Sequence, residues 1–573
     1  MSVVSQSRMR RSGITPQTYV KWILLALVSA MVMGPLFVLV LTSFRPPGAL
    51  PFQDAGYTLA NYVDILTRRG SLRIFWNTLY YASSSVVLGI TIAMIIAWLT
   101  ERTNMGGRTL FRILMFSWMA VPPLVFGYGW ILLINPGNGA INVLLMNVFR
   151  LSGAPLSPYS PLALIIISGL SLVPTAYVMI SGLLRNMDPS LEDAGYVIGA
   201  ARSTTVRKIT LPLMRPGLLS VSIFLIMAMV QTFDLPQILG ATAQFPVLST
   251  RIYLLATPEV GVPNYGLAGA LGVFLLMLAL ALMWFYFRAI QLAERFRTVT
   301  GKGFRPRRSD LGRWRPAAYL FVGTYFTVMI LPLLILLWTS LLPYYRVPSF
   351  AAFADLSLAS YAKVLTEPTV LRAMENTLFL VFISSTAVMA LSCLISWFAV
   401  RSGGRSSRLL DLLSFLPTAV PPIVMAVAML LLFMRSPIYG TIWVIIIGHI
   451  VIYLPFGTRT MNSAFMQIHH ELEHAAAVCG ATWMTGLRRV LVPLVWPHVL
   501  NAWLWVLAHS VRDLTFPLIL LSSQNLVLAS ALYLRWDMPD QTGASAIAMI
   551  LVVGLSALVV PIQIYTTRRI DRD

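Results

Sequence analysis

The chain has few charged residues and almost no cysteine. Asp, Glu, Lys and Arg together make up 11% of the 573 residues, whereas hydrophobic residues make up 57%. A soluble protein of this length could not bury so much apolar surface, so the composition excludes a soluble globular protein and indicates a membrane protein. The two cysteines, Cys393 and Cys479, are too few for a disulfide framework or a cysteine-based metal cluster.

Acidic residues are scarcer than basic ones. The chain has 21 Asp and Glu against 42 Lys and Arg, which gives a formal net charge of +21. The basic residues cluster in some of the segments between apolar runs, most densely from 288 to 315, and leave the segment 135–161 with Arg150 alone. Charge segregated in this way follows the positive-inside rule and sets the orientation in a bilayer. It therefore predicts a lipid bilayer as partner, no nucleic acid, and two cytoplasmic termini.

The chain also lacks a phosphate-binding loop of the form G-x-x-x-x-G-K-[ST]. Gly301-Lys302 comes nearest, but Phe296 stands where the motif requires its first glycine. Without such a loop the sequence offers no visible means of binding the phosphates of ATP.

Long apolar runs, in contrast, recur along the whole chain. About twelve are long enough to cross a bilayer, and a backbone in lipid must satisfy its own hydrogen bonds as helix. We therefore predict an all-α polytopic membrane protein with about 12 transmembrane helices in two six-helix halves, 1–300 and 301–573. The predicted spans are roughly 22–43, 79–99, 112–134, 162–184, 217–239, 266–288, 318–341, 377–400, 411–434, 439–459, 496–521 and 545–566.

The two halves repeat each other. Asn77-Thr78-Leu79 matches Asn376-Thr377-Leu378, and Val121-Pro122-Pro123 matches Val420-Pro421-Pro422, both at an offset of 299 residues (376 − 77 = 421 − 122 = 299). Because each half has an even number of helices, both keep the same orientation, so the repeat is parallel. A parallel repeat predicts a shared transport path between the halves.

A second set of matches lies in two polar, basic loops, predicted at 185–216 and 466–497, where the offset becomes 281 (480 − 199 = 281). In each loop, small residues precede a glycine, and an apolar segment that ends in proline follows. The matched positions of the first loop are Glu192, Asp193, Ala194, Gly195, Gly199, Ile209, Leu211 and Pro212. Those of the second loop are Glu473, His474, Ala475, Ala476, Gly480, Val490, Val492 and Pro493.

This spacing resembles the E-A-A loop of the permease subunits of bacterial ATP-binding-cassette importers, which reads E-A-A, three residues, Gly, nine residues, I-x-L-P. The resemblance covers essentially the whole chain, and two fused permease domains resemble the group that includes ferric-iron, thiamine and 2-aminoethylphosphonate importers. It implies a permease of the bacterial inner membrane that passes a small solute from a periplasmic solute-binding protein to the cytoplasm. Two separate ATPase subunits would dock on the two loops and bind ATP and Mg, so this chain would have no cofactor, no metal and no catalytic residue.

The residue types suit such a loop. Gly199 and Gly480 tolerate the dihedral angles of a bend, and Pro212 and Pro493 fit the first turn of a following helix, where no amide donor is needed. Small residues after position 193 or 474 let another backbone approach closely.

The chain departs from the family at the glutamate position. It has Asp193 in the first loop and His474 in the second. We expect the preceding Glu192 and Glu473 to supply the acidic contact with the partner instead.

The second loop also contains His470-Glu471-Leu472-Glu473-His474, an H-E-x-x-H pattern. On a helix this pattern would place two histidines for zinc and Glu471 as general base, as in an intramembrane zinc metalloprotease. No third ligand is evident and the aligned first-loop residues contain no ligand set, so a polar helix face is favoured. A secondary transporter is a further alternative, against which the duplicated docking loops argue.

Charged residues within apolar runs are rare and costly. Asp234 and Asp513 occupy equivalent positions (513 − 234 = 279), and Arg512 is adjacent to the second. One interpretation is that both acids face the transport path and meet a cationic group of the solute. The other is that they cap helices or pair inside the bundle.

Prolines at matching depth, Pro122 and Pro421 among them, predict interrupted helices along the same path, with ordinary packing kinks as the alternative. All six histidines lie in the second half. The sequence assigns no function to that asymmetry.

Overall fold

The computed structural model describes residues 16–50, 52–53, 55–185, 187, 190–197, 199, 201–295 and 309–570. Within these residues every regular element is a helix, apart from an isolated bridge between Thr103 and Ser309. The predicted all-α class is therefore confirmed.

The first half contains α1 (Pro16–Ser43), α2 (Ala60–Thr67), α3 (Arg69–Arg102), α4 (Arg108–Trp118), α5 (Pro123–Ile134), α6 (Ala140–Phe149), α7 (Pro161–Arg185), α8 (Ser190–Val197), α9 (Arg202–Thr205), α10 (Leu211–Val230), α11 (Leu248–Ala256) and α12 (Tyr265–Arg295). The second half contains α13 (Arg315–Ser340), α14 (Ala359–Thr366), α15 (Pro368–Trp397), α16 (Gly404–Phe415), α17 (Pro422–Phe433), α18 (Ile442–Met466), α19 (Glu471–Val478), α20 (Trp483–Gly486), α21 (Val492–Arg512), α22 (Thr515–Ile519), α23 (Leu528–Trp536) and α24 (Gln541–Ile570). Short 3-10 or π-helical segments are Val206–Thr210, Pro236–Gly240, Gly312–Trp314, Phe350–Asp355, Phe398–Ser402, Leu416–Ala419 and Leu487–Leu491.

Ten helical segments of the described chain are long and apolar enough to cross a membrane, and two bent pairs raise this number to 12 if each is one span. The predicted spans 112–134 and 411–434 are the bent pairs. The first pair, α4 and α5, bends by 99°, and the second, Gly404–Ala419 and α17, by 108°. The predicted kinks are thus sharp breaks.

The breaks follow from the paired prolines. Pro122 has extended backbone (φ −63°, ψ 136°), and Pro421 is nearly the same (φ −57°, ψ 136°). A residue before proline is pushed out of the helical region, and the following Pro123 or Pro422 can start a new helix without an amide donor.

Two other predicted spans end early. The runs 217–239 and 496–521 were expected to be single helices, but α10 ends at Val230 and α21 ends at Arg512. Short helical turns follow each of them. Asp513 therefore lies in a break between helices, whereas Asp234 begins the short helical turn that leads into Pro236–Gly240.

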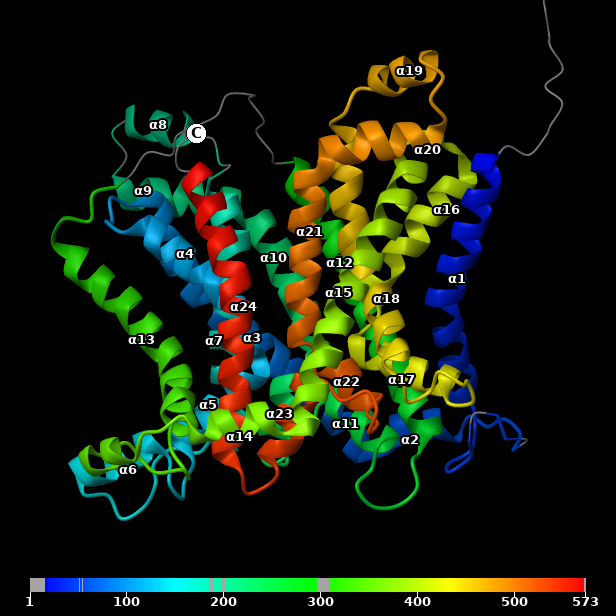
Figure 1. Cartoon of the computed structure of the whole chain (residues 1–573). Helices are drawn as coiled ribbons and strands as arrows, with labels where there is room; N and C mark the ends of the chain where they lie inside the picture. The colour runs from blue at the N-terminus through cyan, green and yellow to red at the C-terminus, as the bar shows by residue number, and fades with distance from the viewer. Residues whose placement is uncertain are drawn as a thin grey trace, which may run out of the picture.

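The two halves interlock. In the bundle, α1 of the first half packs against α16 and α17 of the second, while α13 of the second half packs against α5 of the first. In Figure 1, α1 and α13 accordingly stand at opposite sides of the molecule. The sixth long helices cross over as well, because α24 contacts α4 and α12 contacts α17.

Figure 1 also shows that both loops with repeated motifs lie at one end of the bundle. The helices α8 and α9 and their counterparts α19 and α20 are at this end, together with the start of α1 and the end of α24. The short helices α2, α6, α11, α14 and α23 lie at the opposite end.

The repeated Asn-Thr pair forms hydrogen bonds to the chain segments at that opposite end. The Thr78 hydroxyl accepts a hydrogen bond from the Leu248 amide at 2.9 Å, and the Thr377 hydroxyl accepts one from the Leu528 amide at 2.9 Å. The side chains of Asn77 and Asn376 donate to backbone carbonyls just before the same two helices. In both halves the pair therefore holds the segment that leads into α11 or α23.

Candidate functional site

The two repeated loops are built alike. Each contains a short helix (α8 or α19), a glycine bend, a second short helix (α9 or α20), a π-helical segment and then a long helix. Gly199 has φ +81° and Gly480 has φ +80°, so both bends use the left-handed region. The predicted need for glycine at the two bends is confirmed, since L side chains rarely adopt this conformation.

Pro212 and Pro493 lie in the first turn of α10 and α21, as expected. However, neither proline begins a separate helix, because the π-helical segments Val206–Thr210 and Leu487–Leu491 run directly into α10 and α21. The Leu211 amide bonds the carbonyl of Val206, and the Val492 amide bonds that of Leu487. The wider π turn lies directly before each proline, which has no amide hydrogen to continue the regular pattern.

Glu192 is turned into the protein. Its carboxylate accepts hydrogen bonds from Arg102 Nη1 at 3.1 Å and from the Thr210 hydroxyl at 2.7 Å. The Arg102 side chain is 2% exposed and that of Glu192 is 9% exposed. Arg102 also donates to the carbonyl of Leu184, at the end of the helix that leads into the loop.

The second half repeats this arrangement. Glu473 pairs with Arg401 Nε at 2.7 Å and accepts a hydrogen bond from Trp397 Nε1 at 3.3 Å. Arg401 donates to the carbonyl of Phe465, the counterpart of Leu184 (465 − 184 = 281). In this structure the two glutamates anchor the loops to the body of the chain. The expected contact of either glutamate with a partner stays a prediction.

Apolar side chains occupy the outer surface of the loops. Val197 at the end of α8 is 86% exposed, and its counterpart Val478 is 89% exposed. Ala194, His474 and Ala475 are exposed nearby, whereas the Asp193 side chain lies outside the described part of the chain. The two loops therefore expose an apolar group at equivalent tips.

The other small residues play different parts. Gly195 is buried, and a Cβ there would lie 3.0 Å from Ile209 Cδ1, so glycine is explained by packing within the loop. Its counterpart Ala476 is half-buried, as is Val490, the counterpart of Ile209.

The H-E-x-x-H residues do not converge on a metal. His470 Nε2 lies 2.9 Å from Arg401 Nη1, and His474 is exposed. Among the described residues no group of three or more His, Cys, Asp or Glu side chains could hold a metal ion. The pattern lies at the start of α19, on the polar surface of the loop.

A polar cluster lies at the breaks after α10 and α21. Asp234, Arg512 and Asp513 are close enough to interact electrostatically. Asp513 Oδ2 is 3.0 Å from His449 Nε2 and accepts a hydrogen bond from the Phe516 amide at 3.1 Å. Asp513 thus caps a helix and pairs inside the bundle, which is the structural interpretation for that residue.

Asp234 differs, because it has no hydrogen-bond or ion-pair partner within the described residues. The positive charge of Arg512 is the nearby group that stabilises the Asp234 carboxylate. The described residues therefore give Asp234 no capping or pairing role, and its place on a polar path stays a prediction.

Arg512 connects the two halves. Its Nη1 donates to the carbonyl of Met119 at 2.5 Å. Met119 follows α4 immediately before the Pro122 break, where backbone carbonyls are freed from the helical pattern. The proline-broken span of one half therefore receives the arginine of the other.

Sequence reasoning missed the two histidines of this region. His449 is fully buried beside Asp513, and His509 lies one turn before Arg512. The available signal was a titratable group within an apolar run, the same signal that identified the two acids.

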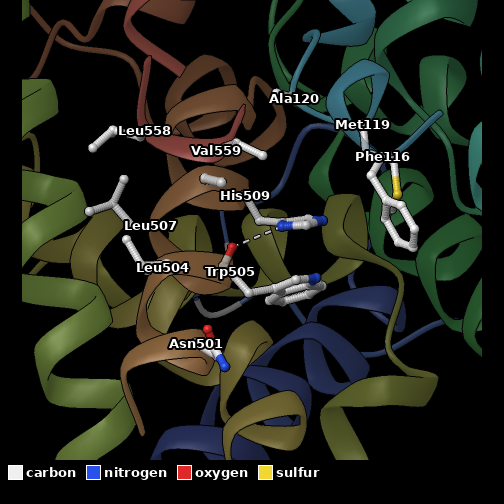
Figure 2. Close-up of a pocket in the computed structure, with 11 residues that line it drawn as sticks. Phe116, Met119, Ala120, Asn501, Leu504, Trp505, Leu507, His509, Leu558 and Val559 are labelled. Carbon is white, nitrogen blue, oxygen red and sulfur yellow. Dashed lines mark hydrogen bonds between the residues drawn. The ribbon is translucent and has the colours of Figure 1, made fainter. Parts of the chain in front are cut away.

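A cavity of about 220 Å³ adjoins the cluster, between α4, α21 and α24. Figure 2 shows the rings of Trp505 and His509 stacked along one wall and extending from α21 towards Phe116. The two ring centroids are 3.7 Å apart, and Trp505 stacks in turn on Phe456 at 3.6 Å. Met119 and Ala120 are also among the lining residues.

Two parallel helical repeats that interlock around a polar cluster and carry matched loops at one end define a fused two-domain membrane permease. The chain belongs to the family described as binding-protein-dependent transport system inner membrane component, whose model matches residues 85–298 and 389–572. It is a multi-pass protein of the inner membrane and a transport subunit.

Relatives cover most of the chain. The permease FbpB 1 of Haemophilus influenzae, whose name refers to a ferric transport system, is 27% identical over 450 residues, which are 76% of this chain and 68% of the relative. The ferric transport system permease protein FbpB of Actinobacillus pleuropneumoniae is 24% identical over 524 residues, 87% of this chain and 72% of the relative.

A solved structure of a bacterial ABC transporter for alginate import is also similar. One of its chains is 18% identical with a TM-score of 0.38, and the match covers 48% of this chain and 96% of that chain.

Proposed function

We propose that this chain is the permease subunit of an ATP-driven importer that two ATPase subunits operate through the loops 185–216 and 466–497. The solute would arrive from a periplasmic binding protein at the opposite end and leave in the cytoplasm. The duplicated loop geometry carries this proposal. Two equivalent docking loops at the same end of the bundle suit two copies of one partner.

Each loop is suited to transmit force. The Glu192–Arg102 and Glu473–Arg401 pairs fix the loops to α3 and to the segment after α15. The exposed Val197 and Val478 remain free to enter an apolar recess of the partner. A partner that holds the two loops differently in two states can shift the halves only through such fixed contacts.

Charge supports the orientation. Arg207, Lys208, Arg488 and Arg489 are exposed at the same end as the loops. By the positive-inside rule, this charge supports a cytoplasmic location for this end and for both termini.

The route through the membrane would follow the cluster of Asp234, Arg512 and Asp513 between the halves. Broken helices at matching positions and ionisable groups at the bilayer midplane are typical of transport sites. Ferric iron, 2-aminoethylphosphonate and thiamine are the candidate solutes, and the FbpB relatives favour iron by name.

Co-purification tests the docking role. We expect Val197→Asp combined with Val478→Asp to abolish recovery of the ATPase with the tagged permease, because a carboxylate would be desolvated in the recess. Val262→Asp is the matched control, since Val262 is 74% exposed between α11 and α12 at the other end. Undiminished recovery of the ATPase with the double variant would contradict the proposal.

A further inference from the structure

The first half contains a segment that the second half lacks. Between α5 and α7 the chain runs through 26 residues, 135–160, whereas the eight residues 434–441 join α17 to α18. The difference, 26 − 8 = 18, equals the change in offset between the two sets of repeated residues, 299 − 281 = 18. The extra residues form α6 and its flanking loops, so the repeat itself does not account for them.

One side of α6 is fixed to the rest of the protein through Asn142, which is fully buried. Its side-chain nitrogen lies 2.9–3.0 Å from the carbonyl oxygens of Ile134, Asn135 and Leu156. Its side-chain oxygen accepts a hydrogen bond from the Leu156 amide at 3.1 Å. These contacts hold α6 against the end of α5 and against the loop that leads into α7.

The other side of α6 is apolar and exposed. Leu144 is 60% exposed and Val148 is 62% exposed. They lie one turn apart and share a face, and because successive residues are about 100° apart, Asn142 projects from the other side of the helix. Phe149 and Leu151 extend the exposed apolar surface past the end of α6.

This apolar surface leads into one that faces lipid. Leu162 and Ile166 lie one turn apart at the start of α7, and both are exposed. Since α7 is long and apolar enough to cross the membrane, an exposed apolar row on it contacts acyl chains. From residue 135 to residue 184 the only charged residue is Arg150. The chain therefore passes from α6 to the lipid-facing row of α7 without an acidic group.

The position of α6 favours lipid over a protein partner. Figure 1 shows α6 at the end opposite the docking loops and at the side of the bundle, below α13, whereas α11 and α23 lie nearer the middle. The Tyr345 hydroxyl, in the segment after α13, donates to the carbonyl of Asn138, just before α6, at 2.9 Å. A protein that delivers a solute must reach the path between the halves. A bilayer surface instead surrounds the periphery, where α6 lies.

Arg150, directly after α6, supplies the one charge of the segment. Its backbone is in the left-handed region (φ +51°), which costs an L residue about 1–2 kcal/mol and favours glycine at a helix end. The backbone therefore does not explain an arginine here. The side chain is exposed and forms no ion pair with any described residue. A guanidinium beside an apolar face matches the phosphate of a lipid headgroup.

We propose that α6 is an interfacial helix that lies in the leaflet opposite the docking loops. Leu144 and Val148 enter the upper part of the acyl chains, and Arg150 binds phospholipid phosphate. Asn142 passes this contact to the end of α5, which belongs to the broken span that receives Arg512. The lipid surface thus holds that span in the first half alone, whichever solute the chain transports.

Fluorescence quenching of the full-length permease in nanodiscs of phosphatidylethanolamine and phosphatidylglycerol tests the inference. Cys393→Ala and Cys479→Ala leave a single cysteine in the variant Val148→Cys, which is labelled with an environment-sensitive fluorophore. An interfacial helix lies about 5–10 Å into the headgroup boundary, so a nitroxide near the headgroup end of the lipid chain should quench the label at least about twofold more than one at the chain terminus.

Val262→Cys in the same background is the matched control. Val262 is 74% exposed at the same end but lies between α11 and α12, so its label should stay in water and resist quenching. Adding Leu144→Asp to Val148→Cys should lower the quenching to the level of this control, because a carboxylate is costly to transfer into lipid. The melting temperature should stay the same, since Leu144 is mostly exposed.

Arg150→Gly separates a lipid contact from a structural role. Glycine adopts the left-handed region freely, so the melting temperature should not fall. We expect spin-labelled phosphatidylglycerol to quench the Val148→Cys label about twofold to fivefold more than spin-labelled phosphatidylethanolamine, because the guanidinium attracts an anionic headgroup. Arg150→Gly should remove this preference, whereas Arg150→Lys keeps the charge and should retain it.

Emission typical of water at the Val148→Cys label, without quenching by either nitroxide, would overturn the inference. Equal quenching of the Val148→Cys and Val262→Cys labels would do the same, since the fluorophore and not the helix would then be entering lipid. Shielding of the Val148→Cys label that appears only when the solute-binding protein is added would assign α6 to that protein and refute the lipid contact.

Discussion

Arg102 and Glu192 form a buried pair, with Nη1 and Oε2 3.1 Å apart, that joins the end of α3 to the first repeated loop. The second half forms the equivalent pair from Arg401 and Glu473, whose carboxylate is more exposed at 21%. The two residues of each pair come from different parts of the repeat. The arginines are related by the offset of 299, and the glutamates by the offset of 281. The pair therefore links the membrane body of each half to its loop.

We expect Glu192→Ala to lower the free energy of unfolding by about 3–5 kcal/mol, because Arg102 would remain buried without a counter-charge. Arg102→Met combined with Glu192→Leu should recover most of this stability, since apolar residues replace the whole pair. Thermal unfolding of the purified protein measures both. If the single and double variants unfolded at the same temperature, the buried charge would not be the cause.

The double variant also separates anchoring from stability. It should remain folded yet show weaker stimulation of the ATPase by solute-loaded binding protein, because the loop has lost its charged tether. Stimulation at the wild-type level would show that the pair has no part in transmitting force.

The bends allow a test within a single loop. Gly480→Ala should reduce solute-stimulated ATP hydrolysis and lower stability by about 1–2 kcal/mol, because φ +80° is costly for an L residue. Gly486→Ala is the matched control: it lies in α20, and a Cβ there would meet nothing within 4 Å. Equal effects of the two substitutions would argue against a conformational requirement at the bend.

The sequence alone was sufficient for the class, the repeat and the position of the loops, because apolar runs and recurring spacing are local signals. It was not sufficient for the helix ends. The apolar run continues through Phe233 and Leu235, so hydropathy did not reveal that α10 ends at Val230. Paired prolines predicted interruption but not a bend of 99°.

The partner of Glu192 could not be predicted either. Arg102 is 90 residues away and belongs to a different helix, and its position depends on how α3 packs against α7 within the same half. The cavity was equally hidden, since it depends on three helices that meet only in the folded chain.

Asp234 and Asp513 should respond differently to substitution. Asp513→Ala removes the cap of the Phe516 amide and the partner of His449, so we expect a loss of about 1–3 kcal/mol in stability. Asp234→Asn removes a charge that has no bonded partner in the described chain, so stability should change little while solute uptake falls. A melting curve and an uptake rate for each variant distinguish the two roles. A strong loss of stability in Asp234→Asn, with uptake per folded molecule unchanged, would assign it a structural role.

Arg512 balances the two acids and holds the carbonyl of Met119 in the other half. Arg512→Met should impair folding and uptake together, because it leaves two carboxylates without a cation and removes a charged hydrogen bond worth about 1.5–3 kcal/mol. Adding Asp234→Asn restores the original net charge of the cluster, so the double variant should unfold at a higher temperature than Arg512→Met alone. The recovery would be partial, because the bond to Met119 stays broken. If Asp234→Asn instead destabilised Arg512→Met further, the electrostatic account of the cluster would be wrong, and Arg512 would act solely through its contact with the broken span.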